Sequence, residues 1–226
     1  MSAHMTNGII TTVLFDLDGT LADTGPDLAN ALNNVLTEQR QPTLPYDQIR
    51  PHVSHGANAM LKLGFGLEPE DDRFPPLRER FLAVYRNNIA QHTRLFPGMD
   101  TVLDTLEARR LRWGVVTNKP GWLTEPLMRE LGLAQRAACV VSGDTTTHRK
   151  PHPEPMFYAC RVTDSRAPQC LYIGDARRDI EAGRRAGMAT LAALFGYIGE
   201  DDPPEQWGAN DLIERPEQIL EWLAIH

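Results

Sequence analysis

Short apolar runs separated by helix-like segments are the feature that most restricts the fold of this chain. The runs are continuous rather than alternating, as expected for strands that are buried on both faces of a parallel sheet. They are Ile9–Phe15, Trp113–Thr117, Cys139–Ser142, Cys170–Ile173 and Ala189–Phe195. Segments with apolar residues at helical spacing lie between several of them. Alternating strands and helices predict an α/β fold in which helices cover both faces of a parallel sheet.

One long stretch interrupts this alternation. From about Thr24 to His92 the sequence carries helix signals and no clear strand. Its two apolar stripes are Leu28, Leu32, Val35 and Leu36, and then Leu77, Phe81, Val84 and Tyr85. We therefore predict a helical subdomain over residues 24–92, inserted into a core built from residues 1–23 and 93–226. Glycines and prolines near both junctions predict that this subdomain closes over the loop after the first strand.

Composition excludes several classes of protein. Lys and Arg total 23 and Asp and Glu total 30, so the formal charge of −7 gives no basic surface for nucleic acid. No apolar run reaches the ~18 residues of a membrane span, and residues 1–8 lack the basic start of a signal peptide. The cysteines, Cys139, Cys160 and Cys170, have no C-x-x-C spacing. They are expected to be reduced core residues, as in a cytoplasmic protein.

Acidic residues follow the first predicted strand directly. Asp16-Leu17-Asp18-Gly19-Thr20 places two carboxylates in one loop, and Gly19 allows a tight turn there. Ligand sites in open parallel sheets lie at the carboxyl ends of strands. The structural alternative is an acidic turn in which an Asp side chain hydrogen-bonds to the backbone of its own loop.

Two further acids follow a later strand. Asp175 comes directly after it, and Asp179 lies four residues on, so the two share a face if a helix begins here. Neighbouring carboxylates repel one another strongly unless a cation is present. Hard oxygen ligands favour Mg²⁺ over zinc, and the sequence therefore predicts a magnesium site.

Hydroxyl, amide and ammonium groups occur at the other strand ends. Thr117 and Asn118 end the second strand, and Lys150 follows the third strand. Each could bind a phosphate oxygen. The prolines beside Lys150 break any helix face that His148 and His152 could share, and Trp113 and Trp122 are expected to be packing residues.

Together, these motifs resemble the haloacid dehalogenase superfamily in its phosphatase branch. The resemblance covers nearly the whole chain and rests on four motifs in order. They are Asp16-Leu17-Asp18-Gly19-Thr20, Thr117 after Gly114-Val115-Val116, Lys150 before Pro151, and Gly174-Asp175-Ala176-Arg177-Arg178-Asp179. It implies a Rossmann-like core with an inserted helical cap.

The resemblance also implies roles for the strand-end residues. Asp16 would attack phosphorus and form an aspartyl-phosphate, while Asp18 would act as general acid and base. Asp16, the carbonyl of Asp18 and Asp175 would hold Mg²⁺, with Asp179 supporting its water shell. The phosphoryl oxygens would be bound by Gly19, Thr117, Asn118 and Lys150.

Within the superfamily, the sequence is similar to bacterial phosphoglycolate phosphatases and to N-acetylmuramic acid 6-phosphate phosphatases. Val115–Pro120 and the segments Gly196–Ile198 and Trp207–Ala209 are similar to both groups. The resemblance places substrate selection in the cap loop Ile49–Ala57, and we expect Arg50, Ser54 and His55 to contact substrate.

Two other activities use the same aspartates. A sugar phosphomutase would return the phosphoryl group to a sugar, and a receiver-like switch would store it on aspartate. The expected activity is Mg²⁺-dependent hydrolysis of a small phosphorylated metabolite, as in the phosphoglycolate phosphatases, with N-acetylmuramic acid 6-phosphate as the alternative substrate. We expect a monomer or homodimer with no nucleic-acid or membrane partner.

Overall fold

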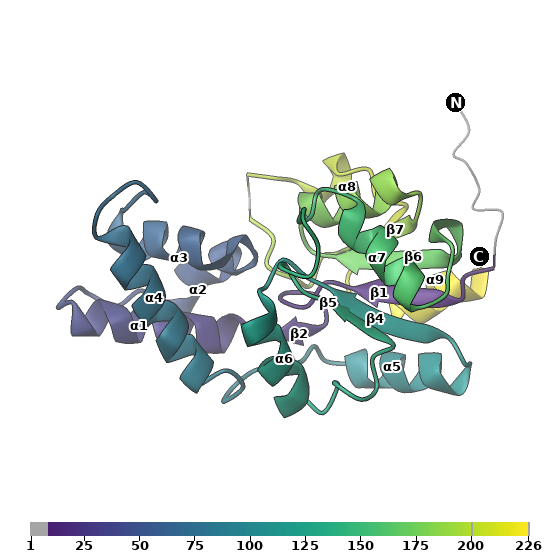
Figure 1. The fold of residues 1–226 in the computed structure, drawn as a ribbon, viewed down its shortest axis with the longest axis horizontal. Coiled ribbons are helices and arrows are strands. Elements are labelled where there is room, and N and C mark those ends of the chain that lie inside the picture. The colour runs from purple at the N-terminus through teal and green to yellow at the C-terminus, as the bar shows by residue number, and fades with distance from the viewer. Residues whose placement is uncertain (1–8, 200, 226) are drawn as a thin grey trace.

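The computed structural model describes residues 9–199 and 201–225, and its centre is a parallel sheet (Figure 1). Six strands pair in the order β5-β4-β1-β6-β7-β8, and every pairing is parallel. The strands are β1 (Thr12–Phe15), β4 (Arg112–Val116), β5 (Cys139–Val141), β6 (Cys170–Gly174), β7 (Ala189–Ala193) and β8 (Asp211–Ile213). The central place of β1 brings its carboxyl end beside those of β4 and β6. Residues 1–8, for which the sequence predicts no signal peptide, lie outside the described residues.

Helices cover both faces of this sheet. Val13 and Phe15 of β1 belong to one buried cluster, whereas Leu14, which points to the other face, belongs to a second. The first cluster includes side chains of α5 (Met99–Ala108), α6 (Gly121–Glu130) and α9 (Gln218–Ile225). The second includes side chains of α7 (Glu154–Val162) and α8 (Arg177–Ala186). The predicted α/β fold with helices on both faces is confirmed.

The segment between residues 23 and 94 is helical and lies to one side of the sheet (Figure 1). It contains α1 (Gly25–Glu38), α2 (Tyr46–Ile49), the 3₁₀-helix η1 (Arg50–His55), α3 (Gly56–Phe65) and α4 (Phe74–Asn87). The chain enters and leaves it through a small antiparallel ribbon of β2 (Ala22–Asp23) and β3 (Arg94–Leu95). We call α1–α4 with η1 the helical cap; its treatment as a separate domain over residues 24–92 remains a proposal.

Several element ends differ from the sequence-based expectations. The first strand begins at Thr12 rather than Ile9, because its neighbours begin pairing only at Arg112 and Cys170. The sequence analysis missed β2, β3, β8 and two 3₁₀-helices, η2 (Ala167–Gln169) and η3 (Pro204–Gln206). These elements are too short to show a hydrophobic period.

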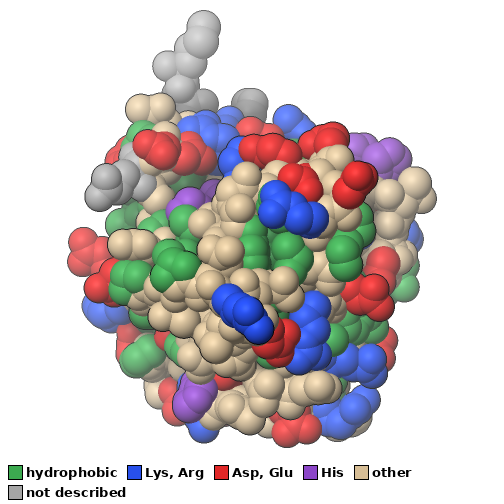
Figure 2. Space-filling view, turned by 90° about the vertical axis from the view of Figure 1, so that its left-hand side faces the viewer, with side chains coloured by type: hydrophobic (Ala, Val, Ile, Leu, Met, Phe, Trp, Pro, Cys, Tyr) green, Lys and Arg blue, Asp and Glu red, His purple; other side chains and the backbone are tan. Residues whose placement is uncertain are grey.

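The cysteines and the charged side chains are placed as the sequence predicts. The three cysteines are free and buried, as expected. On the face shown in Figure 2, acidic and basic side chains are interspersed. Within the described residues, no helix is both long and apolar enough to cross a membrane.

Candidate active site

Asp16 begins the loop after β1 and is almost fully buried, with 3% of its surface exposed. Its Oδ1 accepts a hydrogen bond from the Leu17 backbone N–H at 2.8 Å. Gly19 follows with a positive φ of 83°, and a Cβ there would lie 2.0 Å from Oδ2 of Asp175. This close approach requires glycine and lets the loop pack directly against the end of β6.

Three buried carboxylates meet at these strand ends. Asp16, Asp175 and Asp179 each offer an oxygen, and the three oxygens lie within 4.8 Å of one another. Burial raises the pKa of Asp16, although the Lys150 charge opposes this effect. Burial, together with the charges of Asp16 and Asp179, raises the pKa of Asp175 to about 7. Since a cation would relieve this repulsion, the cluster has the chemistry of a metal site.

An unpartnered oxygen supports the same conclusion. Among the described residues, no donor binds Oδ1 of Asp175, although the atom is buried. Buried acceptors are normally satisfied by a donor, a water or an ion. The carboxylate cluster therefore fits a divalent cation with oxygen ligands.

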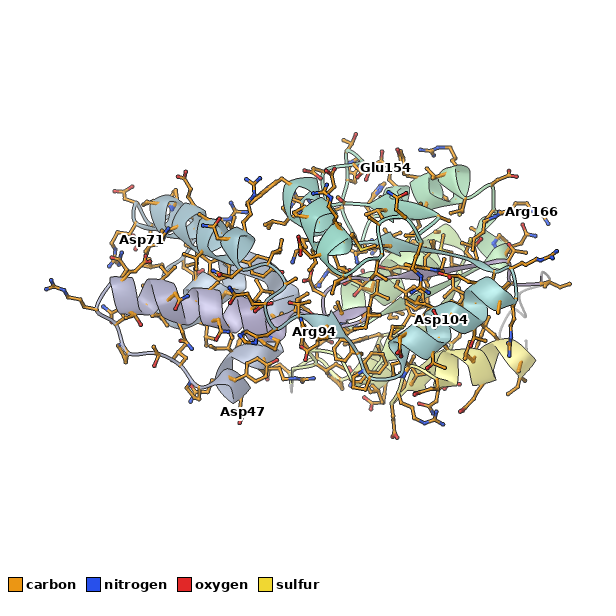
Figure 3. All side chains as sticks on the ribbon, turned by 90° about the horizontal axis from the view of Figure 1, so that it is seen from below. Asp47, Asp71, Arg94, Asp104, Glu154 and Arg166 are labelled. Carbon is orange, nitrogen blue, oxygen red and sulfur yellow. The ribbon has the colours of Figure 1, made fainter. Side chains whose placement is uncertain are left out.

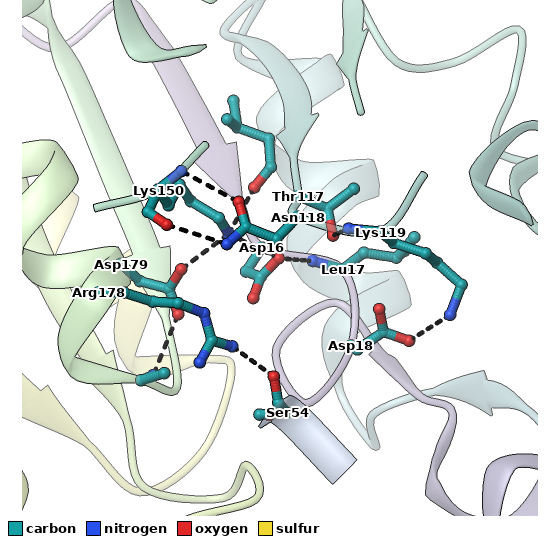
Figure 4. Close-up of polar contacts among 12 residues, drawn as sticks. Asp16, Leu17, Asp18, Ser54, Thr117, Asn118, Lys119, Lys150, Arg178 and Asp179 are labelled. Atoms are coloured by element: carbon teal, nitrogen blue, oxygen red, sulfur yellow. Dashed lines mark hydrogen bonds and ion pairs between the residues drawn. The ribbon is translucent and has the colours of Figure 1, made fainter. Parts of the chain in front are cut away.

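Lys150 is the cation that balances this cluster. Its Nζ forms ion pairs with Oδ1 of Asp16 at 2.8 Å and with Oδ1 of Asp179 at 2.7 Å, and its side chain is 1% exposed (Figure 4). The same ammonium donates to the Tyr172 hydroxyl and the Val116 carbonyl. These contacts place a fixed positive charge against Asp16.

Thr117 and Asn118 lie at the end of β4, as predicted. The Thr117 hydroxyl accepts from the Lys119 N–H at 3.1 Å and keeps its own hydrogen for another acceptor. The Asn118 side chain donates to the Lys150 carbonyl and accepts from the Lys150 N–H, both at 3.0 Å. Asn118 therefore holds the Lys150 backbone, while its predicted contact with phosphate remains a prediction.

Asp18 lies on the cap side of the same loop. Its Oδ1 accepts from the Thr24 hydroxyl at 2.6 Å and from Lys119 Nζ at 2.8 Å. Lys119 also donates to the Tyr85 hydroxyl of α4 at 3.0 Å. Burial disfavours charge on Lys119, but Asp18 and Tyr85 outweigh it and raise the pKa of the Lys119 ammonium. Lys119 thus connects the Asp18 carboxylate to the helical cap.

The predicted cap-loop residues occupy different positions. Ser54 donates its hydroxyl to Oδ2 of Asp175 at 2.6 Å, and Arg178 donates to the Ser54 carbonyl at 2.6 Å. His55 lines the cavity above, and its partial burial, with the Arg178 charge, lowers its pKa. Arg50 instead donates to the Phe195 carbonyl and lies over the ring of Tyr197. Arg50 therefore contacts the core outside the residues that line the cavity.

A cavity of about 580 Å³ separates the helical cap from the strand ends. From the core it is lined by Asp16, Asp18, Thr117, Asn118, Lys119, Pro120, Trp122, Leu123, Asp144, Arg149 and Arg178. From the cap it is lined by Leu28, Val53, Ser54, His55, Gly56, Ala57, Asn58, Arg78, Phe81, Leu82 and Tyr85. Trp122 is 42% exposed at this surface, so its expected role as a packing residue is wrong, whereas Trp113 is 1% exposed as expected.

Sequence reasoning missed three residues of this site. Tyr85 was predicted only as part of an apolar stripe. Lys119 and Arg178 were given no role, because a lysine or arginine after a strand is usually on the surface. Lys119 is nevertheless buried beside Asp18, and the half-buried Arg178 lies close enough to the three carboxylates for their charges to raise its pKa.

Comparison with known proteins agrees with this geometry. Residues 13–193 match the family model described as haloacid dehalogenase-like hydrolase. The chain belongs to this hydrolase family. It is 42% identical over 207 residues to an N-acetylmuramic acid 6-phosphate phosphatase of Pseudomonas putida, covering 92% of this chain and 93% of that protein. It is 43% identical over 209 residues to a phosphoglycolate phosphatase of Xanthomonas campestris, covering 92% and 94%.

A solved structure has the same fold. A predicted phosphoglycolate phosphatase from Haemophilus somnus superposes with a TM-score of 0.85 at 27% identity, covering 96% of this chain and 99% of that chain. The family membership and the two phosphatase relatives identify this chain as a phosphatase of the haloacid dehalogenase-like family.

Proposed function

We propose that this phosphatase hydrolyses monoesters of small phosphorylated metabolites through an aspartyl-phosphate on Asp16. The observation that carries the proposal is the buried cluster of Asp16, Asp175, Asp179 and Lys150, because Asp16 of this cluster lines the cavity. The carboxylate of Asp16 would form a bond to phosphorus while the ester oxygen departs. Water would then cleave the acyl phosphate and restore Asp16.

Asp18 is the proposed general acid and base. Its Oδ1 is held by Thr24 and Lys119, so Oδ2 is the oxygen available to give a proton to the leaving group. The same carboxylate would then take a proton from the attacking water. Such assistance is worth about 10²–10⁴-fold in rate.

Mg²⁺ is the proposed cofactor. Asp16, the backbone carbonyl of Asp18 and Asp175 would hold it, and Asp179 would support its water shell. Three carboxylates, one with an unpartnered oxygen, suit a hard cation with oxygen ligands. Bound there, Mg²⁺ would supply positive charge beside the transferring phosphoryl group.

The phosphoryl oxygens would meet groups of the core. Lys150 offers a fixed positive charge, and Thr117 offers a hydroxyl group. Gly19 and Asn118 are the two further residues that we propose to bind phosphoryl oxygens. Because phosphoryl transfer depends mainly on positioning and on charge neutralisation, these fixed donors suit the reaction.

Two substrates are in question. The first is 2-phosphoglycolate, which several relatives at 35–43% identity act on according to their names. The alternative is N-acetylmuramic acid 6-phosphate, and the cavity of about 580 Å³ favours it, because a two-carbon phosphate would leave most of that volume empty. Comparing kcat/KM for the two substrates decides between them.

Replacing the nucleophile tests the hydrolase mechanism. We expect Asp16→Asn to abolish phosphate release, whereas Asp100→Asn, at an exposed position on α5, should retain it. Phosphatase activity that survives in Asp16→Asn would contradict the proposal. Transfer of phosphate to a second sugar position would instead indicate a phosphomutase, and a long-lived phospho-Asp16 without turnover would indicate a receiver-like switch.

The cellular compartment and the oligomeric state of the enzyme are also part of the proposal. We expect the enzyme to act in the cytoplasm as a monomer or homodimer, since its free cysteines suit a reducing compartment.

A further inference from the structure

One residue of the helical cap contacts the carboxylate cluster of the core directly. Ser54 lies in η1, and its hydroxyl donates to Oδ2 of Asp175 at 2.6 Å, although the two residues are 121 positions apart. Arg178, in the first turn of α8, donates to the Ser54 carbonyl at 2.6 Å (Figure 4). Ser54 is therefore bonded to the core through both its side chain and its backbone.

The two oxygens of Asp175 have different surroundings. Oδ2 accepts from the Ser54 hydroxyl and, at 2.9 Å, from the Tyr197 backbone N–H. Gly19 and Gly196 crowd the same side chain, since a Cβ at either position would lie within 2.3 Å of an Asp175 atom. Oδ1 is buried and has no donor among the described residues. Because a carboxylate is planar, the two donors on Oδ2 also fix the direction of Oδ1.

The Ser54 hydroxyl is already used by this contact. A serine hydroxyl carries one hydrogen, and that of Ser54 is given to Asp175. Ser54 lines the cavity, but it can offer a substrate there only acceptor lone pairs. The oxygens of a phosphate or a carboxylate are acceptors too, so this hydroxyl suits Asp175 better than it suits an anionic substrate.

We propose that Ser54 is a positioning residue through which the cap sets the Mg²⁺ affinity of the core. The inference rests on the proposed function, which places Mg²⁺ on Asp175. Hydrogen-bond donors to a metal-binding carboxylate orient it, and losing such a donor typically weakens metal binding about 10–100-fold. With Oδ2 held by Ser54 and Tyr197, Oδ1 is the oxygen that is free to bind the cation.

The origin of this donor couples the metal to the cap. The chain joins the cap to the core through β2 and β3, and Figure 3 places Arg94 of β3 between the two parts. Ser54 lies outside this connection, so its bond to Asp175 forms only when the cap loop rests on the core. A contact that strengthens ion binding is strengthened by the ion to the same degree. Mg²⁺ therefore holds the cap loop against the core.

Calorimetric titration with Mg²⁺ in the absence of substrate tests the role of Ser54. We expect one ion per chain in the wild type and a Kd about tenfold higher, or more, in Ser54→Ala. Ser54→Thr keeps a hydroxyl and should bind Mg²⁺ nearly as tightly as the wild type. Thr37→Ala removes an exposed hydroxyl that bonds only within α1 of the cap, and it should leave the Kd unchanged.

Hydrogen exchange measures the coupling to the cap. In the wild type, saturating Mg²⁺ should slow the exchange of amides in the cap loop, residues 49–57, by up to about tenfold. In Ser54→Ala this protection by Mg²⁺ should be largely lost. Protection of the same size in both proteins would show that Ser54 does not link the ion to the cap.

Other results would overturn the proposal in distinguishable ways. An Mg²⁺ Kd that is unchanged or lower in Ser54→Ala would reject the role of Ser54 and leave the proposed metal site standing, as would an equal loss in Ser54→Thr. A raised KM at saturating Mg²⁺ with an unchanged Mg²⁺ Kd would assign Ser54 to the substrate. Equal Mg²⁺ binding by the wild type and Asp175→Asn would instead reject the proposed metal site, and the inference with it.

Discussion

The core wall and the cap wall of the cavity are built differently. On the core wall, Asp16 lines the cavity, and behind it the buried Lys150 lies 2.8 Å from Asp16 and 2.7 Å from the buried Asp179. On the cap wall, Asn58 and Arg78 are exposed and joined by one hydrogen bond of 3.1 Å. Buried ionic groups cannot change without a large cost, whereas exposed side chains can. The contrast supports the proposal that the core carries out the chemistry and the cap selects the substrate.

The strongest test of this contrast removes the buried cation. We expect Lys150→Met to lower kcat by about 10²–10³-fold, because a fixed charge beside the phosphoryl group is lost. Leaving Asp16 and Asp179 without their partner should also lower the free energy of unfolding by about 3–5 kcal/mol. Steady-state kinetics and urea unfolding measure the two effects.

The matched control is Lys62→Met on the cap. Lys62 forms an exposed pair with Glu68, and its loss should leave both quantities nearly unchanged. Equal losses in the two variants would remove the distinction between the walls.

A smaller effect concerns pH and the carboxylate cluster. The pKa of Asp175 is about 7 in the fold against 3.8 for an unperturbed aspartate, so the folded protein keeps a proton that the unfolded chain releases. Without metal, the free energy of unfolding should therefore fall as pH rises from about 4 to about 7, by a few kcal/mol. Thermal unfolding in a chelator measures this.

Mg²⁺ should reverse that trend, because it binds the deprotonated carboxylates. We expect it to raise the Tm more at pH 8 than at pH 5, and this difference should shrink in Asp175→Asn. An equal Mg²⁺ effect at both pH values would show that the core cluster does not bind the ion as proposed.

The smallest expected effect lies on the cap wall. Arg78→Ala should raise the KM for the preferred substrate about fivefold, roughly 1 kcal/mol, with kcat nearly unchanged. Arg80→Ala is the control, since Arg80 lies on the same helix but pairs with Glu38 away from the cavity. A fall in kcat at constant KM would place Arg78 in the chemistry instead.

The same contrast explains what could be predicted from sequence. Asp16, Asp175 and Asp179 follow buried strands, and strand ends meet at one edge of a sheet, so their proximity was predictable. The pairing of Lys119 with Tyr85 joins residues 34 positions apart, and nothing local marks either partner. Contacts between the cap and the core depend on how these two parts pack together. The spacing of apolar residues predicts a helix or a strand, but it does not predict which element packs against it.

Short elements escaped prediction for a related reason. β8 has only three residues, of which Ile213 is buried, so it lacks the apolar run that marks the other strands. β2 and β3 have two residues each and exist because they pair with one another. The predicted closure of the cap and the division at residues 24–92 remain predictions.

The first buried cluster has a consequence for how the molecule melts. It runs without a break from Leu32 and Phe81 of the cap to Phe15 and Val115 of the sheet. Loosening one part would expose apolar surface of the other to water, which couples their unfolding. Heating should therefore produce a single calorimetric transition, with equal calorimetric and van't Hoff enthalpies.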